Sequence, residues 1–431
     1  MNNSSIKLLC TADLHLGRHP TRIPEEFDSR EFSPISVWEK IVKKAINLGV
    51  DAVVITGDII DKENRFFEAF GPLEAGIKKL EKEEVFLFGV AGNHDVEALK
   101  KLNQNIDSEY FNLLGLGGEW ESKTISKNNQ DVLEIIGWSY PRKSFSLNPL
   151  KKLDFEAKDY PTLGLIHSEL DNPSSNYAPV SREGLQSLGL TCWILGHIHQ
   201  SFLINNNFSF ILNPGSPLPL NPGEPGEHWV WEVTLNSKSD YKIDKHKLNP
   251  LQYLKLNIDI SSLENIEKIT SFISEKLRNQ LKNKDFLIEN ELILVRLILS
   301  GSTRLSRDIE VVKESIIEEL ELNIKGVKIL IEKIINKTEL NINLEKYTDQ
   351  QNQMGLLADY INKIKMGETE KLPQELIEKV EKKMWEVYKA NAYKPLRSQN
   401  EIEPPSSQEI ISILEEEGYN ILRTLWKQKE D

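Results

Sequence analysis

The sequence predicts an α/β fold, and three observations support this. Short apolar runs alternate with helix-like stretches over residues 6–235. Many of these runs are apolar at nearly every position, which is typical of strands buried on both faces of a sheet. The length of 431 residues is enough for two or three domains with cores of their own.

Eight strands are expected in this first part of the chain, each a short apolar run. They are 6–12, 51–56, 85–91, 132–138, 162–167, 191–195, 208–212 and 228–235. Helices are expected at 36–48, 66–82 and 181–188, and the first two repeat apolar residues at the i, i+3, i+4 spacing of an amphipathic helix. Segments 139–162 and 213–227 are rich in Pro, Asn, Ser and Gly and are expected to be loops. We therefore expect a first domain over residues 1–240.

Two further units are expected after the junction at 236–250. Residues 250–338 predict a small α/β domain: strand 251–260, helix 262–283, strand 291–300, helix 305–320 and strand 325–336. It contains no histidine and no catalytic constellation. Residues 344–431 predict a helical C-terminal region, with helices near 345–365, 373–391 and 407–427 and a Pro-rich linker before the last. The apolar stripe of that last helix fits either packing within its own domain or docking into a partner's groove.

Composition and charge narrow the class of protein. The net charge of −13 excludes the bulk basic character of a protein that binds nucleic acid tightly by itself. DNA is still possible as a substrate, because bound cations and a partner can supply positive charge. The two cysteines, Cys10 and Cys192, sit in apolar runs and exclude a disulfide scaffold. With no signal-peptide pattern and no apolar run near ~20 residues, a soluble cytoplasmic protein is expected.

Five clusters of metal-capable side chains stand at or just after the ends of predicted strands. In chain order they are Asp13 with His15, Asp58 with Asp61, Asn93 with His94 and Asp95, His167 alone, and His197 with His199. Residues at i and i+2 of an extended chain point to the same side, so each such pair can share one ion. Ligands collect at the carboxyl ends of strands in open α/β sheets. Each cluster alone is common, but all five in this order predict a metal site rather than unrelated buried polar groups.

The residue types indicate which metals and which chemistry. Imidazole, carboxylate and amide ligands without thiolate suit Mn, Fe or Zn better than a Ca or Mg cage. Two such ions about 4 Å apart, bridged by a carboxylate, can ionise a bound water and clamp a phosphoryl group. A nearby histidine that is not a ligand can then protonate the leaving oxygen.

The order of the motifs, D-x-H, G-D-x-x-D, G-N-H-D, H and G-H-x-H, resembles the calcineurin-like metallophosphoesterase superfamily. Within it, the chain resembles the SbcD-type DNA repair exonuclease subunits. That narrower resemblance rests on TADLHLGR at 11–18, VAGNHD at 90–95, LGHIHQ at 195–200 and NPGSPLPLNPGEPGEH at 213–228. It is specific over about residues 1–235 and looser beyond them.

The resemblance implies a fold and a set of ligands. The fold would be a two-sheet sandwich flanked by helices, followed by a small α/β capping domain and a helical tail. One metal ion would be held by Asp13, His15, Asp58 and His199, and a second by Asp58, Asn93, His167 and His197. His94 would be the catalytic histidine, and Asp61 and Asp95 would orient ligands. The two divalent ions would be Mn²⁺.

The resemblance also implies partners. They are DNA as substrate, an SbcC-like coiled-coil ATPase that the helical tail binds, and a second copy of the chain. The homodimer would use helices 36–48 and 66–82, although Phe66, Phe67 and Phe70 fit a core role better. Arg18, Arg22 and Arg30, which follow the first motif, fit phosphate contacts and solvated charges equally well.

Three functions follow from these patterns. The first is a Mn²⁺-dependent DNA exonuclease and endonuclease of DNA repair, the nuclease subunit of an SbcCD-like complex. The alternative is a metal-dependent phosphodiesterase or phosphatase that acts on a substrate other than DNA. A non-catalytic scaffold is the third, and the complete ligand set with His94 argues against it.

Overall fold

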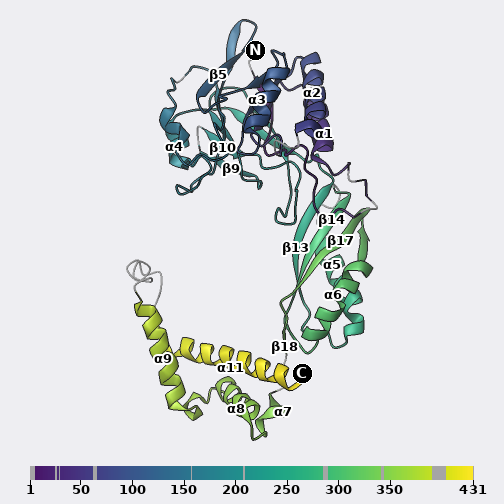
Figure 1. The fold of residues 1–431 in the computed structure, drawn as a ribbon, viewed down its shortest axis with the longest axis vertical. Coiled ribbons are helices and arrows are strands. Elements are labelled where there is room, and N and C mark those ends of the chain that lie inside the picture. Colours follow the sequence, from purple (N-terminus) through teal and green to yellow (C-terminus); the bar gives the residue numbers. More distant parts are fainter. Residues whose placement is uncertain are drawn as a thin grey trace. The chain divides into compact units, whose positions relative to one another are not determined.

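The computed structural model describes residues 5–430 apart from 25–26, 29, 62–65, 157, 207–208, 285–289, 341–343 and 391–403. The chain divides into two compact units. The first holds Met1–Ile258, Thr270–Ile298 and Lys313–Ile335, and the second holds Asp259–Ile269, Leu299–Val312 and Asn336–Asp431. Within the described residues, the first unit contains two six-stranded sheets (Figure 1).

The first sheet has the strand order β12-β11-β1-β2-β3-β4. Its strands are β1 (Ile6–Thr11), β2 (Ala52–Thr56), β3 (Phe86–Val90), β4 (Phe111–Leu113), β11 (Val230–Leu235) and β12 (Tyr241–His246). Strands β1 to β4 run parallel, whereas β11 pairs antiparallel with both of its neighbours, β1 and β12. The carboxyl ends of β1, β2 and β3 therefore share one edge of the sheet.

The second sheet has the order β5-β6-β7-β8-β10-β9. Its strands are β5 (Trp120–Lys127), β6 (Gln130–Trp138), β7 (Thr162–His167), β8 (Cys192–Gly196), β9 (Phe202–Asn205) and β10 (Phe210–Asn213). Strands β6, β7, β8 and β10 run parallel. Their carboxyl ends also meet at one edge, which bears two of the five predicted clusters.

The two sheets pack face to face, because alternate residues of each strand face opposite cores. In β1, Leu8 and Cys10 enter the core between the sheets, and Leu9 enters the core under the helices. Cys192 and Ile194 of β8 line the same inter-sheet core. Both faces of these strands are thus buried, which explains their nearly continuous apolar sequences.

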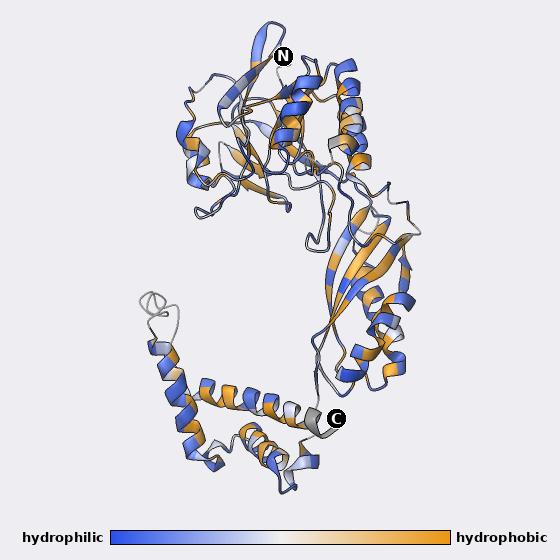
Figure 2. Ribbon diagram, in the orientation of Figure 1, coloured by the Kyte–Doolittle hydropathy of each residue, from blue (hydrophilic) through white to orange (hydrophobic). Residues whose placement is uncertain are grey.

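Helices cover the outer faces of the sandwich. They are α1 (Pro34–Leu48), α2 (Phe66–Lys82), α3 (Val96–Asn105) and α4 (Arg182–Ser187). Their apolar stripes face the sheets and their polar faces look outward (Figure 2). The chain has a mixed α/β fold with two sheets flanked by helices and a helical C-terminal part, which confirms the predicted fold class.

The third sheet of the first unit has the order β13-β14-β17-β16. Its strands are β13 (Leu251–Asp259), β14 (Leu292–Ser300), β16 (Glu321–Ile324) and β17 (Val327–Asn336). Between β13 and β16 the chain also forms α5 (Ile269–Leu281) and α6 (Ser306–Glu319), and α6 is divided between the two units. The sequence analysis missed β16, which forms a hairpin with β17 through Lys325 and Gly326. Both of these residues have a positive φ, as a two-residue hairpin turn requires. The expected helix at 262–283 is also shorter, because a 3-10 turn at Ile266–Lys268 precedes α5.

The second unit holds the C-terminal helices α7 (Glu345–Thr348), α8 (Gln353–Lys365), α9 (Gln374–Lys389) and α11 (Ser407–Glu430). A small core of Leu344, Met354, Ala358, Ile361 and Leu422 joins α8 to α11. The last helix therefore packs partly within its own unit. The single helix expected at 345–365 is broken, because Asn352 caps the start of α8. Most of the predicted Pro-rich linker lies outside the described residues.

Several other predictions need correction. Strands β4, β5, β9 and β12 and helix α3 were missed, and the junction at 236–250 contains β12. Strand β5 reads WESKTISK, an exposed edge strand without an apolar run. Phe67 is 91% exposed, so the core role expected for it is wrong, whereas Phe70 packs partly against the core. The side chain of Phe66 lies outside the described residues.

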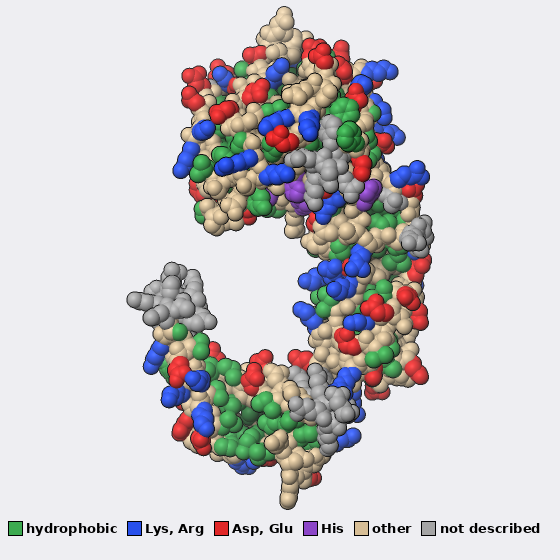
Figure 3. All heavy atoms as spheres, viewed as in Figure 1, with side chains coloured by type: hydrophobic (Ala, Val, Ile, Leu, Met, Phe, Trp, Pro, Cys, Tyr) green, Lys and Arg blue, Asp and Glu red, His purple; other side chains and the backbone are tan. Residues whose placement is uncertain are grey.

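On the face shown in Figure 3, acidic and basic side chains intermingle over the part that holds the two six-stranded sheets. None of the described helices is both long enough and apolar enough to cross a membrane.

Candidate metal centre

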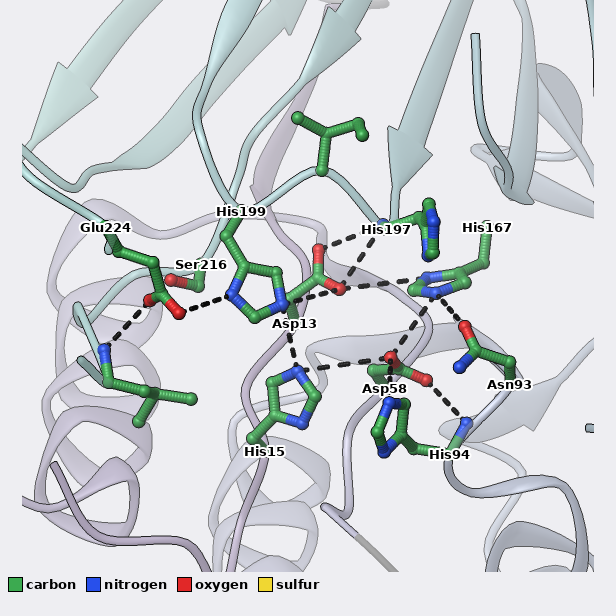
Figure 4. A network of polar contacts seen from close by, with 12 residues as sticks. Asp13, His15, Asp58, Asn93, His94, His167, His197, His199, Ser216 and Glu224 are labelled. Carbon is green, nitrogen blue, oxygen red and sulfur yellow. Dashed lines mark hydrogen bonds and ion pairs between the residues drawn. The ribbon is translucent and has the colours of Figure 1, made fainter. Parts of the chain in front are cut away.

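All five predicted clusters meet at one place in the structure (Figure 4). Asp13 and His15 follow β1, Asp58 follows β2, and Asn93 and His94 follow β3. His167 ends β7, and His197 and His199 follow β8. The carboxyl edges of the two parallel sheet regions thus supply the site from both layers of the sandwich.

Asp58 lies at the middle of the site. Its Oδ2 atom is 3.4 Å from His167 Nε2 and 3.9 Å from the Nε2 atoms of both His15 and His94. Its Oδ1 atom accepts a hydrogen bond from the backbone N–H of His94 at 2.9 Å. One buried carboxylate oxygen therefore faces three imidazoles, which is the arrangement a bridging ligand needs.

A second group of donors surrounds Asp13. The Nε2 atoms of His15 and His199 face each other at 3.2 Å, and His199 Nε2 lies 3.9 Å from Asp13 Oδ1. Among the described residues, three triads bring one ligand atom each within 4.8 Å of one another. They are Asp13, His15 and His199; His15, Asp58 and His94; and Asp13, Asp58 and His167. Geometry alone thus allows His94 to act as a ligand as well.

The partners of the Nδ1 atoms decide which nitrogen faces the site. His167 Nδ1 lies 3.0 Å from the Thr56 carbonyl oxygen, and His94 Nδ1 lies 2.9 Å from the Asp61 carbonyl oxygen. A carbonyl oxygen only accepts, so each Nδ1 carries the proton and each Nε2 presents its lone pair. His15 Nδ1 makes no hydrogen bond within the described residues, but it lies 3.2 Å from Asp61 Oδ1, and this negative charge favours a proton on Nδ1.

These tautomers test whether the residues fit a metal. His167 Nε2 directs its lone pair at two acceptors, Asn93 Oδ1 at 3.2 Å and Asp58 Oδ2 at 3.4 Å. Buried lone pairs that face one another repel unless a cation, either a proton on Nε2 or a metal ion, lies among them. The donor set therefore fits divalent metal ions.

His197 is placed differently from the other predicted ligands. Its ring contacts Tyr177 with the centroids 4.7 Å apart and His167 with the centroids 5.3 Å apart. Its Nε2 atom is 3.9 Å from Glu169 Oε2, and its backbone N–H donates to the carboxylate of Asp13. The structure thus brings His197 to the site, but its ring is not part of the three triads.

The pKa values show how the site distributes charge. Burial alone would raise the pKa of Asp58, but His167, His15 and His94 lower it well below its usual range. Burial lowers the pKa of His167, and Asp58 and Asp13 outweigh this and raise it to about 9. Burial and the nearby His167 lower the pKa of His197 to about 4. The carboxylates thus make the position of His167 favour positive charge.

Backbone conformation also marks the site. Asp13, His15, Asp58 and His197 have φ values of 49°, 48°, 47° and 89°. Such left-handed conformations are unfavourable for residues with a Cβ atom and concentrate at functional sites. The turns that follow the strands therefore hold these side chains at a cost in backbone energy.

Two motif glycines have a steric reason. A Cβ atom at Gly92 would lie 2.1 Å from Asp58 Oδ1. A Cβ atom at Gly196 would lie 1.9 Å from the Thr56 carbonyl oxygen and 2.7 Å from His167 Nδ1. Gly92 therefore lets the loops after β2 and β3 lie close together, and Gly196 lets the two layers approach each other at the site.

Asp95 ties two of the motif loops together. Its Oδ2 accepts hydrogen bonds from the backbone N–H groups of Ile59 at 2.6 Å and Ile60 at 3.3 Å, and its Oδ1 accepts from Gly92 at 2.8 Å. The side chain is fully buried and makes no cap bond to α3. These hydrogen bonds fix the backbone of the loops that carry Asp58 and Asn93.

The sequence analysis missed Tyr177 and Glu169 beside His197, and it missed Glu224, whose Oε1 lies 3.0 Å from His199 Nδ1. The loop of Glu224 was quoted for the family resemblance, but no motif spacing marks this glutamate. Of the three arginines considered for phosphate contact, only Arg18 lies beside the site, 3.7 Å from Asp61. Arg22 pairs with Glu332 and Arg30 with Asp28. The neighbouring His19 is exposed.

Residues 6–201 match the family model described as calcineurin-like phosphoesterase. The chain is similar to an uncharacterized metallophosphoesterase, YhaO of Bacillus subtilis. The two sequences are 21% identical over 323 residues, which are 69% of this chain and 72% of YhaO.

Proteins named DNA double-strand break repair protein Mre11 are also similar. The one from Sulfolobus acidocaldarius is 23% identical over 399 residues, 89% of this chain and 98% of that protein. The one from Methanocaldococcus jannaschii is 27% identical over 202 residues, 44% of this chain and about half, 51%, of that protein. Among solved structures, calcineurin-like phosphoesterase YfkN from Bacillus subtilis covers 64% of this chain and 98% of its own, at 15% identity and a TM-score of 0.36. A likeness at that level says nothing about the substrate.

Proposed function

We propose that this chain is a dinuclear-metal phosphodiesterase that cleaves DNA, the nuclease subunit of an SbcCD-like repair complex. One observation carries the chemistry: the Asp58 carboxylate faces three imidazoles from both layers of the sandwich. The choice of DNA is supported by the similarity to the Sulfolobus Mre11 protein over 89% of this chain.

Eight coordination positions would be filled by seven residues. Asp13, His15 and His199 would hold one metal ion, Asn93, His167 and His197 would hold the other, and Asp58 would bridge them. The ions, which we propose to be Mn²⁺, would supply an ionised water and a clamp for the phosphoryl group. His197 is included because of its place in the G-H-x-H motif. Its ring lies beside the ring of His167, another ligand of the same ion, and also contacts Tyr177.

His94 is proposed to handle the proton of the leaving group. The Asp61 carbonyl oxygen fixes its Nδ1–H, so its Nε2 atom faces the site. Its side chain is 36% exposed, whereas those of His15 and His167 are buried. In its imidazolium form it can reach a substrate from the solvent side and donate a proton from Nε2 to the departing oxygen.

The net negative charge of the chain opposes its binding to DNA, so binding requires positive charge from bound metal ions or a partner. The net charge is −13, and acidic and basic side chains intermingle on the face seen in Figure 3. We propose that an SbcC-like coiled-coil ATPase and a second copy of this chain complete the complex. In the second unit, an apolar groove of about 670 Å³ between α9 and α11, lined by Val380, Met384, Val387 and Ile413, supports a tail that binds a partner helix.

The test uses end-labelled linear duplex DNA and the full chain, in Mn²⁺ with and without EDTA. We expect metal-dependent degradation that His94→Ala reduces by about 10²–10⁴-fold. The matched control is His19→Ala, since His19 is exposed and belongs to none of the three triads. Mn²⁺ affinity, measured by calorimetry, should be unchanged in both variants if His94 is not a ligand.

Two results would count against the proposal. Intact DNA together with cleavage of bis-p-nitrophenyl phosphate would favour a phosphodiesterase for a substrate other than DNA. Full activity of His94→Ala on DNA would remove this histidine from the reaction.

A further inference from the structure

We propose that Glu224 is a positioning residue of the metal centre, which holds His199 in the tautomer that presents a lone pair to the metal. The inference rests on the metal centre proposed above. Glu224 lies in the loop between β10 and β11, beyond the residues that match the family model. It is thus assigned here from its contacts alone.

The contact between the two side chains decides the state of the ring. Glu224 Oε1 lies 3.0 Å from His199 Nδ1, and this carboxylate can only accept, so Nδ1 donates its proton. A neutral imidazole has a single N–H, and Nε2 then carries the lone pair that faces His15 and Asp13. Without this acceptor the proton can move to Nε2, and that tautomer cannot bind a metal through Nε2.

The carboxylate of Glu224 is itself held in place. Its Oε2 accepts a hydrogen bond from the backbone N–H of Leu220 at 2.9 Å, and its Oε1 also accepts from Asn221 Nδ2 at 2.5 Å. The side chain is only 13% exposed. Both oxygens are therefore oriented before His199 is engaged, which is the arrangement by which an outer carboxylate fixes a metal-binding histidine.

The loop that carries Glu224 is anchored on two sides. The ring of the buried His228 lies between two loop carbonyls, with Nδ1 2.8 Å from Ser216 O and Nε2 3.2 Å from Glu224 O. The backbone N–H of Gly226 donates to the carbonyl oxygen of Tyr253 in β13 at 3.0 Å. The position of Glu224 is therefore set by the sandwich and by the adjacent small sheet.

A simpler role would be that Glu224 only stabilises its own loop through Leu220 and Asn221. The two roles differ in one measurable respect. A residue that acts through His199 loses its effect on metal affinity once His199 is removed, whereas a residue that acts through the loop keeps it.

The experiment is a double-mutant cycle on the full chain, read by calorimetric titration with Mn²⁺. Glu224→Ala should lower the affinity for the same Mn²⁺ ion whose binding His199→Ala also weakens, by about 10–100-fold. The matched control is Glu227→Ala, because Glu227 is exposed in the same loop. In the His199→Ala background, Glu224→Ala should change the affinity by less than about twofold if its effect runs through His199.

Unfolding in EDTA, followed by tryptophan fluorescence, checks that each variant is folded. If Glu224→Ala is not, Glu224→Met carries the test, since methionine keeps about the same size and offers no oxygen acceptor. The inference is overturned if the single variant binds Mn²⁺ like the wild type, or if it loses the same factor without His199. If His199→Ala itself binds Mn²⁺ normally, the proposed metal centre fails, which is a different result.

Discussion

Replacing Asp95 by alanine tests whether one buried carboxylate holds the loops of the metal centre in place. The carboxylate accepts from three backbone N–H groups, of Ile59, Ile60 and Gly92, at 2.6, 3.3 and 2.8 Å. In Asp95→Ala, these groups lose their acceptor in a fully buried position. The α3 helix itself should be spared, because the Asp95 side chain makes no cap bond to it.

The expected cost can be worked from these contacts. A hydrogen bond to a charged group contributes about 1.5–3 kcal/mol, so the two short bonds together contribute about 3–6 kcal/mol. Removing the carboxylate also relieves its repulsion with Asp58, which together with burial raises the pKa of Asp95 to about 7. Allowing for that relief, we expect a net loss of about 2–4 kcal/mol in the free energy of unfolding.

The assay is urea unfolding in EDTA, followed by tryptophan fluorescence. Six of the eight tryptophans precede residue 250, so the signal reports mainly on the two-sheet sandwich. Asp107→Ala is the matched control, because Asp107 is an exposed acidic residue just after α3. A loss below about 1 kcal/mol, or one equal to that of the control, would refute the reasoning, because neutral surface changes stay within about 0.5 kcal/mol.

Three further predictions follow from the site. Gly92→Ala should abolish Mn²⁺ binding, because the new Cβ would lie 2.1 Å from Asp58 Oδ1, whereas Gly71→Ala has open space and should bind Mn²⁺ normally in the same titration. Arg18→Ala should raise the KM for DNA, because this guanidinium lies at the site beside Asp61, where it can contact a phosphate. Arg30→Ala breaks only a surface pair with Asp28 and should leave the KM unchanged. Raising the salt from 50 to 200 mM should reduce cleavage of DNA by about tenfold or more and leave cleavage of bis-p-nitrophenyl phosphate nearly constant, since only the polyanion releases counterions on binding.

Each of these has a clear contrary outcome. Normal Mn²⁺ binding by Gly92→Ala would mean that Asp58 can move without loss of the site. Equal KM values for the two arginine variants would mean that Arg18 is a solvated charge that does not contact DNA. A flat salt response on DNA would exclude binding dominated by phosphate contacts.

The sequence alone predicted the clusters of metal-capable residues at the strand ends, whereas the two-sheet layering was expected from the family resemblance. Strands that are buried on both faces leave continuous apolar runs, so β1, β2, β7 and β8 could be read directly. The clusters at their carboxyl ends were predicted to meet because parallel strands end at a common edge. Edge strands such as β5 were missed, since one solvated face removes the apolar run.

Only the tertiary structure could decide how the ligands are oriented. Whether Nδ1 or Nε2 faces the centre depends on acceptors far away in the chain, such as the Thr56 carbonyl for His167 and Glu224 for His199. The close approach that forbids a side chain at Gly92 is likewise a contact between separate strands. The sequence shows which side chains are present and therefore which chemistry is possible. The orientation of those side chains depends on contacts that exist only once the two sheets have packed together.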